Sequence, residues 1–190
     1  MSKKLFLIIG APGSGKTTDA EIIAQQNESI THYSAGEMLR AEIATGSVLG
    51  QEIDSYVSNG KIVPIDIAIK TILGAIKNAP TQVIIIDGYP RSIEQMEELD
   101  IYLNNENEVE LINVMEVKVS DEVARDRVIG RARGADDKIE IFNHRMEVYT
   151  EPLAAIQSFY TNKNILHVID GERSIEEVVE DMNSFILSKI

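Results

Sequence analysis

The 190-residue sequence contains no cysteine and no tryptophan, and its basic residues are few. Without cysteine the chain forms no disulfide bond and no thiolate metal site. Its 18 lysines and arginines are outnumbered by 31 aspartates and glutamates, and the formal net charge of -13 disfavours binding to nucleic acid or to an anionic membrane surface. No apolar run approaches the roughly 18 residues that a membrane span needs. We therefore expect one cytoplasmic domain over residues 1–190, monomeric, with no nucleic-acid or membrane partner.

Short apolar runs alternate with longer amphipathic segments along the whole chain. The runs at 5–9 and 83–86 are unbroken, which is typical of strands buried on both faces of a parallel sheet. Further strands are predicted at 113–119 and 165–169, and a weaker one at 31–34. The last helix is predicted to begin after Ser174, which forms a capping box with Glu177. This alternation predicts an open α/β sheet with right-handed crossovers, whose ligands lie beyond the carboxyl ends of the strands.

A phosphate-binding loop is predicted directly after the first strand. Residues 10–17 read Gly-Ala-Pro-Gly-Ser-Gly-Lys-Thr, with a buried strand before them and a helical segment after them. The glycines allow backbone N–H groups to converge on phosphate oxygens, and the helix adds its free N–H groups and dipole. Lys16 can reach the β- and γ-phosphates, and the Thr17 hydroxyl can complete a Mg²⁺ shell. The alternative, a glycine-rich turn with an incidental lysine, is disfavoured by both flanks.

A candidate magnesium ligand ends the second apolar run. Asp87 follows residues 83–86, where a carboxylate can hold Mg²⁺ through water. A helix-capping aspartate and an Asp-Gly hairpin turn are the alternatives. Because Pro90 and a helical pattern follow instead of a returning strand, we favour the metal role.

The eight arginines are unevenly distributed. Five fall in one stretch, namely Arg125, Arg127, Arg131, Arg133 and Arg145, and the others are Arg40, Arg91 and Arg173. Guanidinium groups bind phosphate oxygens in a bidentate manner and balance charge in phosphoryl transfer. Glycines at 130 and 134 indicate a mobile flap around Arg131 and Arg133. A solvated helical face is the alternative, and clustering in so acidic a chain favours a functional role.

Taken together and in order, these motifs resemble adenylate kinases across essentially the whole chain. The segments that carry the resemblance are Gly10-Ala-Pro-Gly-Ser-Gly-Lys16, Ser34-Ala-Gly-Glu-Met-Leu-Arg40, Gly60-Lys-Ile-Val-Pro64, Asp87-Gly-Tyr-Pro-Arg91 with Gln95, Asp126-Arg-Val-Ile-Gly-Arg131, Asp136-Asp137 before Arg145, and Asp170-Gly-Glu-Arg173. The resemblance implies a P-loop domain with a five-stranded parallel sheet flanked by helices. It also implies an NMP-binding segment at 34–63 and a short lid at 130–136, which without cysteine carries no zinc.

The resemblance further assigns roles to residues of this sequence. ATP would be bound by Gly13, Ser14, Gly15, Lys16, Thr17, Thr18, Arg127, Arg131 and Arg173. AMP would be bound by Arg40, Lys61, Ile62, Val63, Gly88, Tyr89, Pro90, Arg91, Gln95, Arg133 and Arg145. The catalytic cations would be Lys16, Arg91, Arg131, Arg133 and Arg145, and Mg²⁺ would be held by Thr17 and Asp87. Ala35 stands where the family has threonine, so that hydroxyl contact to AMP is absent.

The expected reaction is in-line transfer of a phosphoryl group from ATP to AMP, giving two ADP without a covalent intermediate. Gln95 has two readings, because it either hydrogen-bonds adenine or completes a capping box with Ser92. Two alternatives to the function remain open at this point. One is a kinase of UMP or CMP, and the other is a nucleotide-binding switch that performs no transfer.

Overall fold

A five-stranded parallel sheet forms the centre of the computed structural model, which describes residues 2–105, 107–131 and 138–190. Its strand order is β2-β3-β1-β4-β5. The strands are β1 (Lys3–Gly10), β2 (Ile30–Ser34), β3 (Val83–Asp87), β4 (Val109–Lys118) and β5 (Leu166–Asp170). The predicted α/β class and all five predicted strands are confirmed. β1 and β2 begin two and one residues earlier than expected, and β4 begins four residues earlier, because it continues past a register shift opposite Leu5 and Phe6 of β1.

The central strand β1 is buried on both faces, which explains its unbroken apolar run. Leu5 and Leu7 belong to the core cluster on one face, and Phe6 and Ile8 to the cluster on the other. All four are 0% exposed. Because successive side chains of a strand point to opposite faces, the run supplies both cores at once.

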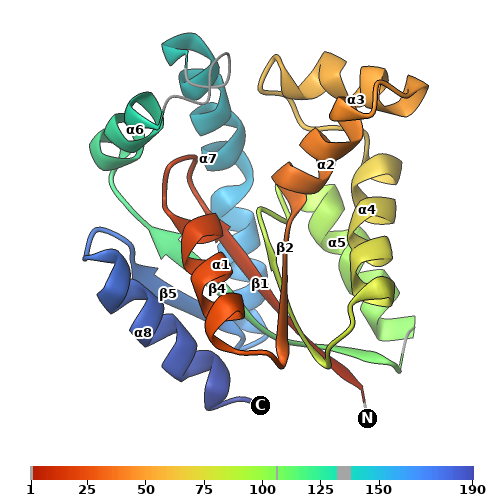
Figure 1. Ribbon diagram of the computed structural model, residues 1–190, viewed down its shortest axis with the longest axis vertical. Helices are drawn as coiled ribbons and strands as arrows, with labels where there is room; N and C mark the ends of the chain where they lie inside the picture. The colour runs from red at the N-terminus through yellow and green to blue at the C-terminus, as the bar shows by residue number, and fades with distance from the viewer. Residues whose placement is uncertain (1, 106, 132–137) are drawn as a thin grey trace.

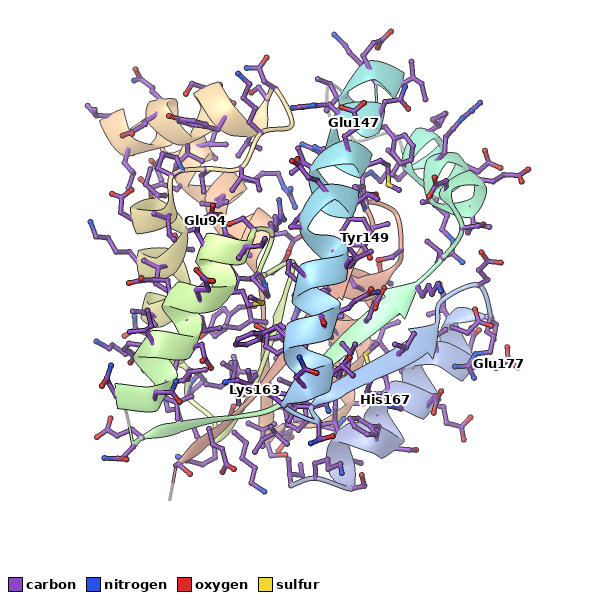
Figure 2. All side chains as sticks on the ribbon, turned by 180° about the vertical axis from the view of Figure 1, so that it is seen from behind. Glu94, Glu147, Tyr149, Lys163, His167 and Glu177 are labelled. Atoms are coloured by element: carbon purple, nitrogen blue, oxygen red, sulfur yellow. The ribbon has the colours of Figure 1, made fainter. Side chains whose placement is uncertain are left out.

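Eight helices lie in the described part of the chain, and five of them cover the two faces of the sheet. Helices α1 (Lys16–Gln26) and α8 (Ile175–Leu187) lie on one face (Figure 1). Helices α4 (Ile65–Asn78), α5 (Ile93–Asn105) and α7 (Ile139–Asn162) lie on the other (Figure 2). The capping box predicted for α8 is present, with the Ser174 hydroxyl and the Glu177 carboxylate each accepting a backbone N–H. No helix among the described residues is both long and apolar enough to cross a membrane.

The other three helices, α2 (Ala35–Ala44), α3 (Val48–Val57) and α6 (Asp121–Gly130), lie beyond the carboxyl ends of the strands. In Figure 1 the pair α2 and α3 stands on one side of the loop after β1, and α6 with the start of α7 stands on the other. Both chain termini lie at the opposite end of the molecule. The fold thus leaves the loop after β1 facing the space between two groups of helices.

Candidate active site

The loop between β1 and α1 has a backbone that only glycine fits at several positions. Gly13 has a φ of +82°, and a Cβ there would lie 2.4 Å from the carbonyl oxygen of Ala124. A Cβ at Gly10 would lie 2.7 Å from the Ser14 hydroxyl oxygen. Helix α1 begins at Lys16, so its free N–H groups and positive dipole end point into the loop. This geometry suits a group of phosphate oxygens.

The carboxylate of Asp87 is the meeting point of side chains from two neighbouring elements. It is 1% exposed, and one oxygen accepts a hydrogen bond from the Thr17 hydroxyl at 2.8 Å and one from the Ser34 hydroxyl at 3.3 Å. The other oxygen lies 2.7 Å from Nε2 of His32. Burial raises the pKa of Asp87, but the hydrogen bond with His32, the charge of Lys16 and the Thr17 hydroxyl outweigh it and hold the pKa below its ordinary value. The carboxylate is therefore anionic at neutral pH. The hairpin alternative is excluded, because the two strands that pair with β3 among the described residues, β1 and β2, are parallel to it, and α5 follows it.

A cleft of about 1180 Å³, part of it open to solvent, faces the loop and gathers cations from distant parts of the chain. The basic residues in its lining are Lys16, Arg40, Lys61, Arg91, Arg131 and Arg145. The guanidinium groups of Arg40 and Arg91 approach each other over Gly36, where a Cβ would lie 3.3 Å from one and 3.2 Å from the other. Burial lowers the pKa of Arg91, repulsion from Arg145 and Arg40 lowers it further, and attraction to Asp87 opposes the shift. Since arginine stays protonated, this crowding of positive charge favours an anion in the cleft.

A smaller pocket, of about 400 Å³, adjoins the cleft and has Gln95 in its lining. Its apolar lining includes Leu39, Val57, Val63, Ala68 and Ile72. Gln95 is 3% exposed, and its side-chain oxygen accepts the backbone N–H of Arg91 at 2.8 Å. The Gln95 backbone N–H bonds the Ser92 hydroxyl at 3.2 Å, so only half of the expected capping box forms. Among the described contacts the Gln95 amide nitrogen has no protein acceptor, and it remains able to donate into the pocket.

Five of the expected ATP-binding residues lie outside the lining of the cleft, namely Ser14, Gly15, Thr18, Arg127 and Arg173. Arg127 donates to the carbonyl oxygen of Ser14 at 3.2 Å and to that of Gly171 at 3.0 Å, which ties the phosphate loop to the segment after β5. Arg173 pairs with Asp181 at 2.7 Å. Thr18 is exposed on α1. Arg133 and most of the expected lid at 130–136 lie outside the described residues.

Sequence reasoning missed three groups at the site. His32 sits on the strand predicted most weakly, and only the pairing of β2 with β3 brings it to Asp87. Asp19, in the first turn of α1, is 3% exposed, and burial raises its pKa to about 6 although Arg127 and Lys16 oppose the shift. Tyr149 and Pro152 of α7 line the cleft. An acidic residue so close to a phosphate loop was a signal for Asp19, but nothing local marked the other two groups.

Comparison with known proteins agrees with this geometry. Residues 8–165 match the adenylate kinase family. The chain is 63% identical to an adenylate kinase of Campylobacter lari over 184 residues, which is 97% of each chain. It is 62% identical to one of Helicobacter hepaticus and 63% identical to one of Wolinella succinogenes, in both cases over 99% of this chain and 100% of the other. A P-loop, a second cationic site opposite it and this similarity over the full length lead to one conclusion: the chain belongs to the adenylate kinase family.

Proposed function

We propose that this chain transfers the γ-phosphoryl group of ATP to AMP, reversibly, to give two ADP. The observation that carries the proposal is the cleft itself, in which a phosphate loop on one side faces Arg40, Arg91 and Arg145 on the other. A protein that only binds a nucleotide has no use for a second cluster of cations. Two anionic substrates held end to end account for both halves.

The acceptor half is proposed to bind AMP. Arg40 and Arg91 would hold its phosphate, and the apolar pocket would take its base. Gln95 then presents its amide N–H groups to a ring nitrogen of adenine, because its oxygen is already used by the Arg91 backbone. Residues Lys61–Val63 and Gly88–Pro90 line the same pocket or the adjoining cleft. We assign residues 34–63 as the mobile NMP-binding segment on this basis.

The donor half is proposed to bind ATP at the loop, with Lys16 on the β- and γ-phosphates and Arg131 closing from α6. Residues 130–136 would serve as a short lid, with Arg133 contributing a further cation. The oxygens of Thr17 and Asp87 fit Mg²⁺, since they are hard donors 2.8 Å apart at the end of the loop. Bound there, the ion would neutralise part of the negative charge of the ATP phosphates.

The reaction follows from this arrangement without a general base. A phosphate oxygen of AMP, already anionic near neutral pH, attacks the γ-phosphorus, and the bond to the β–γ bridging oxygen breaks to release ADP. Lys16, Arg91 and Arg145 balance the charge spread over the transferred group. The apolar walls formed by α7 exclude water, which otherwise would accept the phosphoryl group. We place the reaction in the cytoplasm, carried out by a monomer.

A coupled assay of ADP formation tests the proposal. With Mg²⁺ and ATP present, AMP is expected to be the preferred acceptor when it is compared with CMP, UMP and dTMP. A preference for a pyrimidine nucleotide would overturn the assignment of the base pocket. An absence of acceptor-dependent ADP formation would instead indicate a nucleotide-binding module.

A further inference from the structure

The buried carboxylate of Glu116 lies outside the lining of the cleft and has no role in the reaction described above. Only 1% of the residue is exposed, and on β4 it lies between Ile9 of β1 and Val168 of β5. Burying a carboxylate costs free energy unless hydrogen-bond donors surround it. The donors around Glu116 therefore indicate what it does.

Two donors from α7 reach this carboxylate in the described structure. The Gln157 amide nitrogen donates to both oxygens, at 3.0 Å and 2.8 Å. The pKa of the Tyr149 phenol is raised by burial, and also by the charge of Glu116 and a hydrogen bond to it. Figure 2 shows Tyr149 on α7 beside the end of β4. One carboxylate of the sheet thus holds two residues of the same helix, eight positions apart.

Between Tyr149 and Gln157, helix α7 lacks one backbone hydrogen bond. Helix α7 is continuous from Ile139 to Asn162 but contains Pro152. Proline has no N–H, so the carbonyl of Val148 lacks its hydrogen bond within the helix, and a bend is easier at this turn than elsewhere. Tyr149 precedes Pro152 and Gln157 follows it. Glu116 therefore contacts α7 on both sides of Pro152.

The half of α7 before Pro152 carries Arg145. Arg145 and Tyr149 are four residues apart on one helix face, and both line the cleft. Arg145 also donates through Nη2 to the carbonyl oxygen of Val57 at 3.3 Å, on the acceptor side. Any rotation of this half about Pro152 displaces the guanidinium group of Arg145 relative to the phosphate loop.

We propose that Glu116 is a positioning residue, which keeps the two halves of α7 aligned across Pro152 and so fixes Arg145 for phosphoryl transfer. The proposal rests on the proposed function, in which Arg145 contacts the transferred group. It predicts that weakening the contacts of Glu116 with Tyr149 and Gln157 lowers the rate of the chemical step while substrate binding changes little.

The test compares Tyr149→Phe and Glu116→Gln with the parent enzyme. Tyr149→Phe keeps the ring in the cleft wall and removes only the hydroxyl. For both variants kcat is expected to fall about tenfold, with KM for ATP and AMP within about twofold, because small misplacements of a catalytic group cost rate. The matched control is Tyr160→Phe, a buried tyrosine of the same helix whose pKa is raised by burial and by the charges of Tyr89 and Asp100. Its kcat is expected to stay unchanged.

The same substitutions in an Arg145→Lys background separate positioning from general stability. There, Tyr149→Phe is expected to reduce kcat less than about twofold, because the group that it positions is already altered. A full additional loss in that background, or an unchanged kcat in the parent background, would overturn the positioning role. If Glu116→Gln fails to fold by circular dichroism, Tyr149→Phe decides the question. A parent enzyme without AMP-dependent ADP formation would instead refute the proposed function.

Discussion

Two glycines inside helices test how closely α3 packs against α2, because one lies at this contact and the other faces open space. A Cβ added at Gly74 in α4 meets nothing within 4 Å, whereas one added at Gly50 in α3 would lie 2.4 Å from the carbonyl oxygen of Glu42 in α2. Substitution by alanine removes the same backbone freedom from the unfolded chain at both positions. The two substitutions are therefore expected to change stability in opposite directions.

The magnitudes follow from these distances. Gly74→Ala gains helix propensity and is expected to raise the free energy of unfolding by about 1 kcal/mol. Gly50→Ala gains the same propensity, but α2 and α3 must separate by roughly 1 Å to restore van der Waals contact. Overpacking of this kind costs about 1–3 kcal/mol, so the net change is a loss of up to about 2 kcal/mol.

Urea unfolding monitored by far-UV circular dichroism measures both changes. Because Gly50 lies in the segment assigned to AMP binding, Gly50→Ala is also expected to raise KM for AMP, while Gly74→Ala leaves it unchanged. If Gly50→Ala stabilised the protein as much as Gly74→Ala, the tight contact between α2 and α3 would be refuted, and with it the link to AMP binding.

Two other predictions concern charge. Because burial raises the folded pKa of Asp19 from 3.8 to about 6, the contribution of this carboxyl to stability is present below the unfolded pKa and is lost as pH rises through about 6. Asp19→Asn is therefore expected to add up to about 3 kcal/mol to the free energy of unfolding at pH 8 and little at pH 4; an equal gain at both pH values, measured by urea unfolding, would contradict this. Arg91→Ala is expected to lower kcat at least about 100-fold with the circular dichroism spectrum unchanged. Arg125→Ala, an exposed arginine outside the lining of the cleft, is the control, and near-normal activity of Arg91→Ala would mean that the phosphate contacts are misplaced.

The sequence by itself determined the features whose causes are local. The phosphate loop is contiguous, and its glycines are required by backbone geometry at the loop itself. The central strand β1 could be predicted from the sequence, because a strand buried on both faces consists of an unbroken apolar run. The cap of α8 was readable because Ser174 and Glu177 are three residues apart. Each of these features depends on residues that are close together in the sequence.

The tertiary structure decided the features in which distant residues meet. Asp87 could be named from its strand, but its contact with His32 depends on the pairing of β2 with β3. Two roles were open for Gln95 until the fold directed its side-chain oxygen to the Arg91 backbone, which left its amide N–H groups able to donate into the smaller pocket. Glu116 carried no signal, because its role depends on how α7 crosses β4 and on where Pro152 falls. Contacts over long separations follow from the packing of whole elements, and no local pattern encodes them.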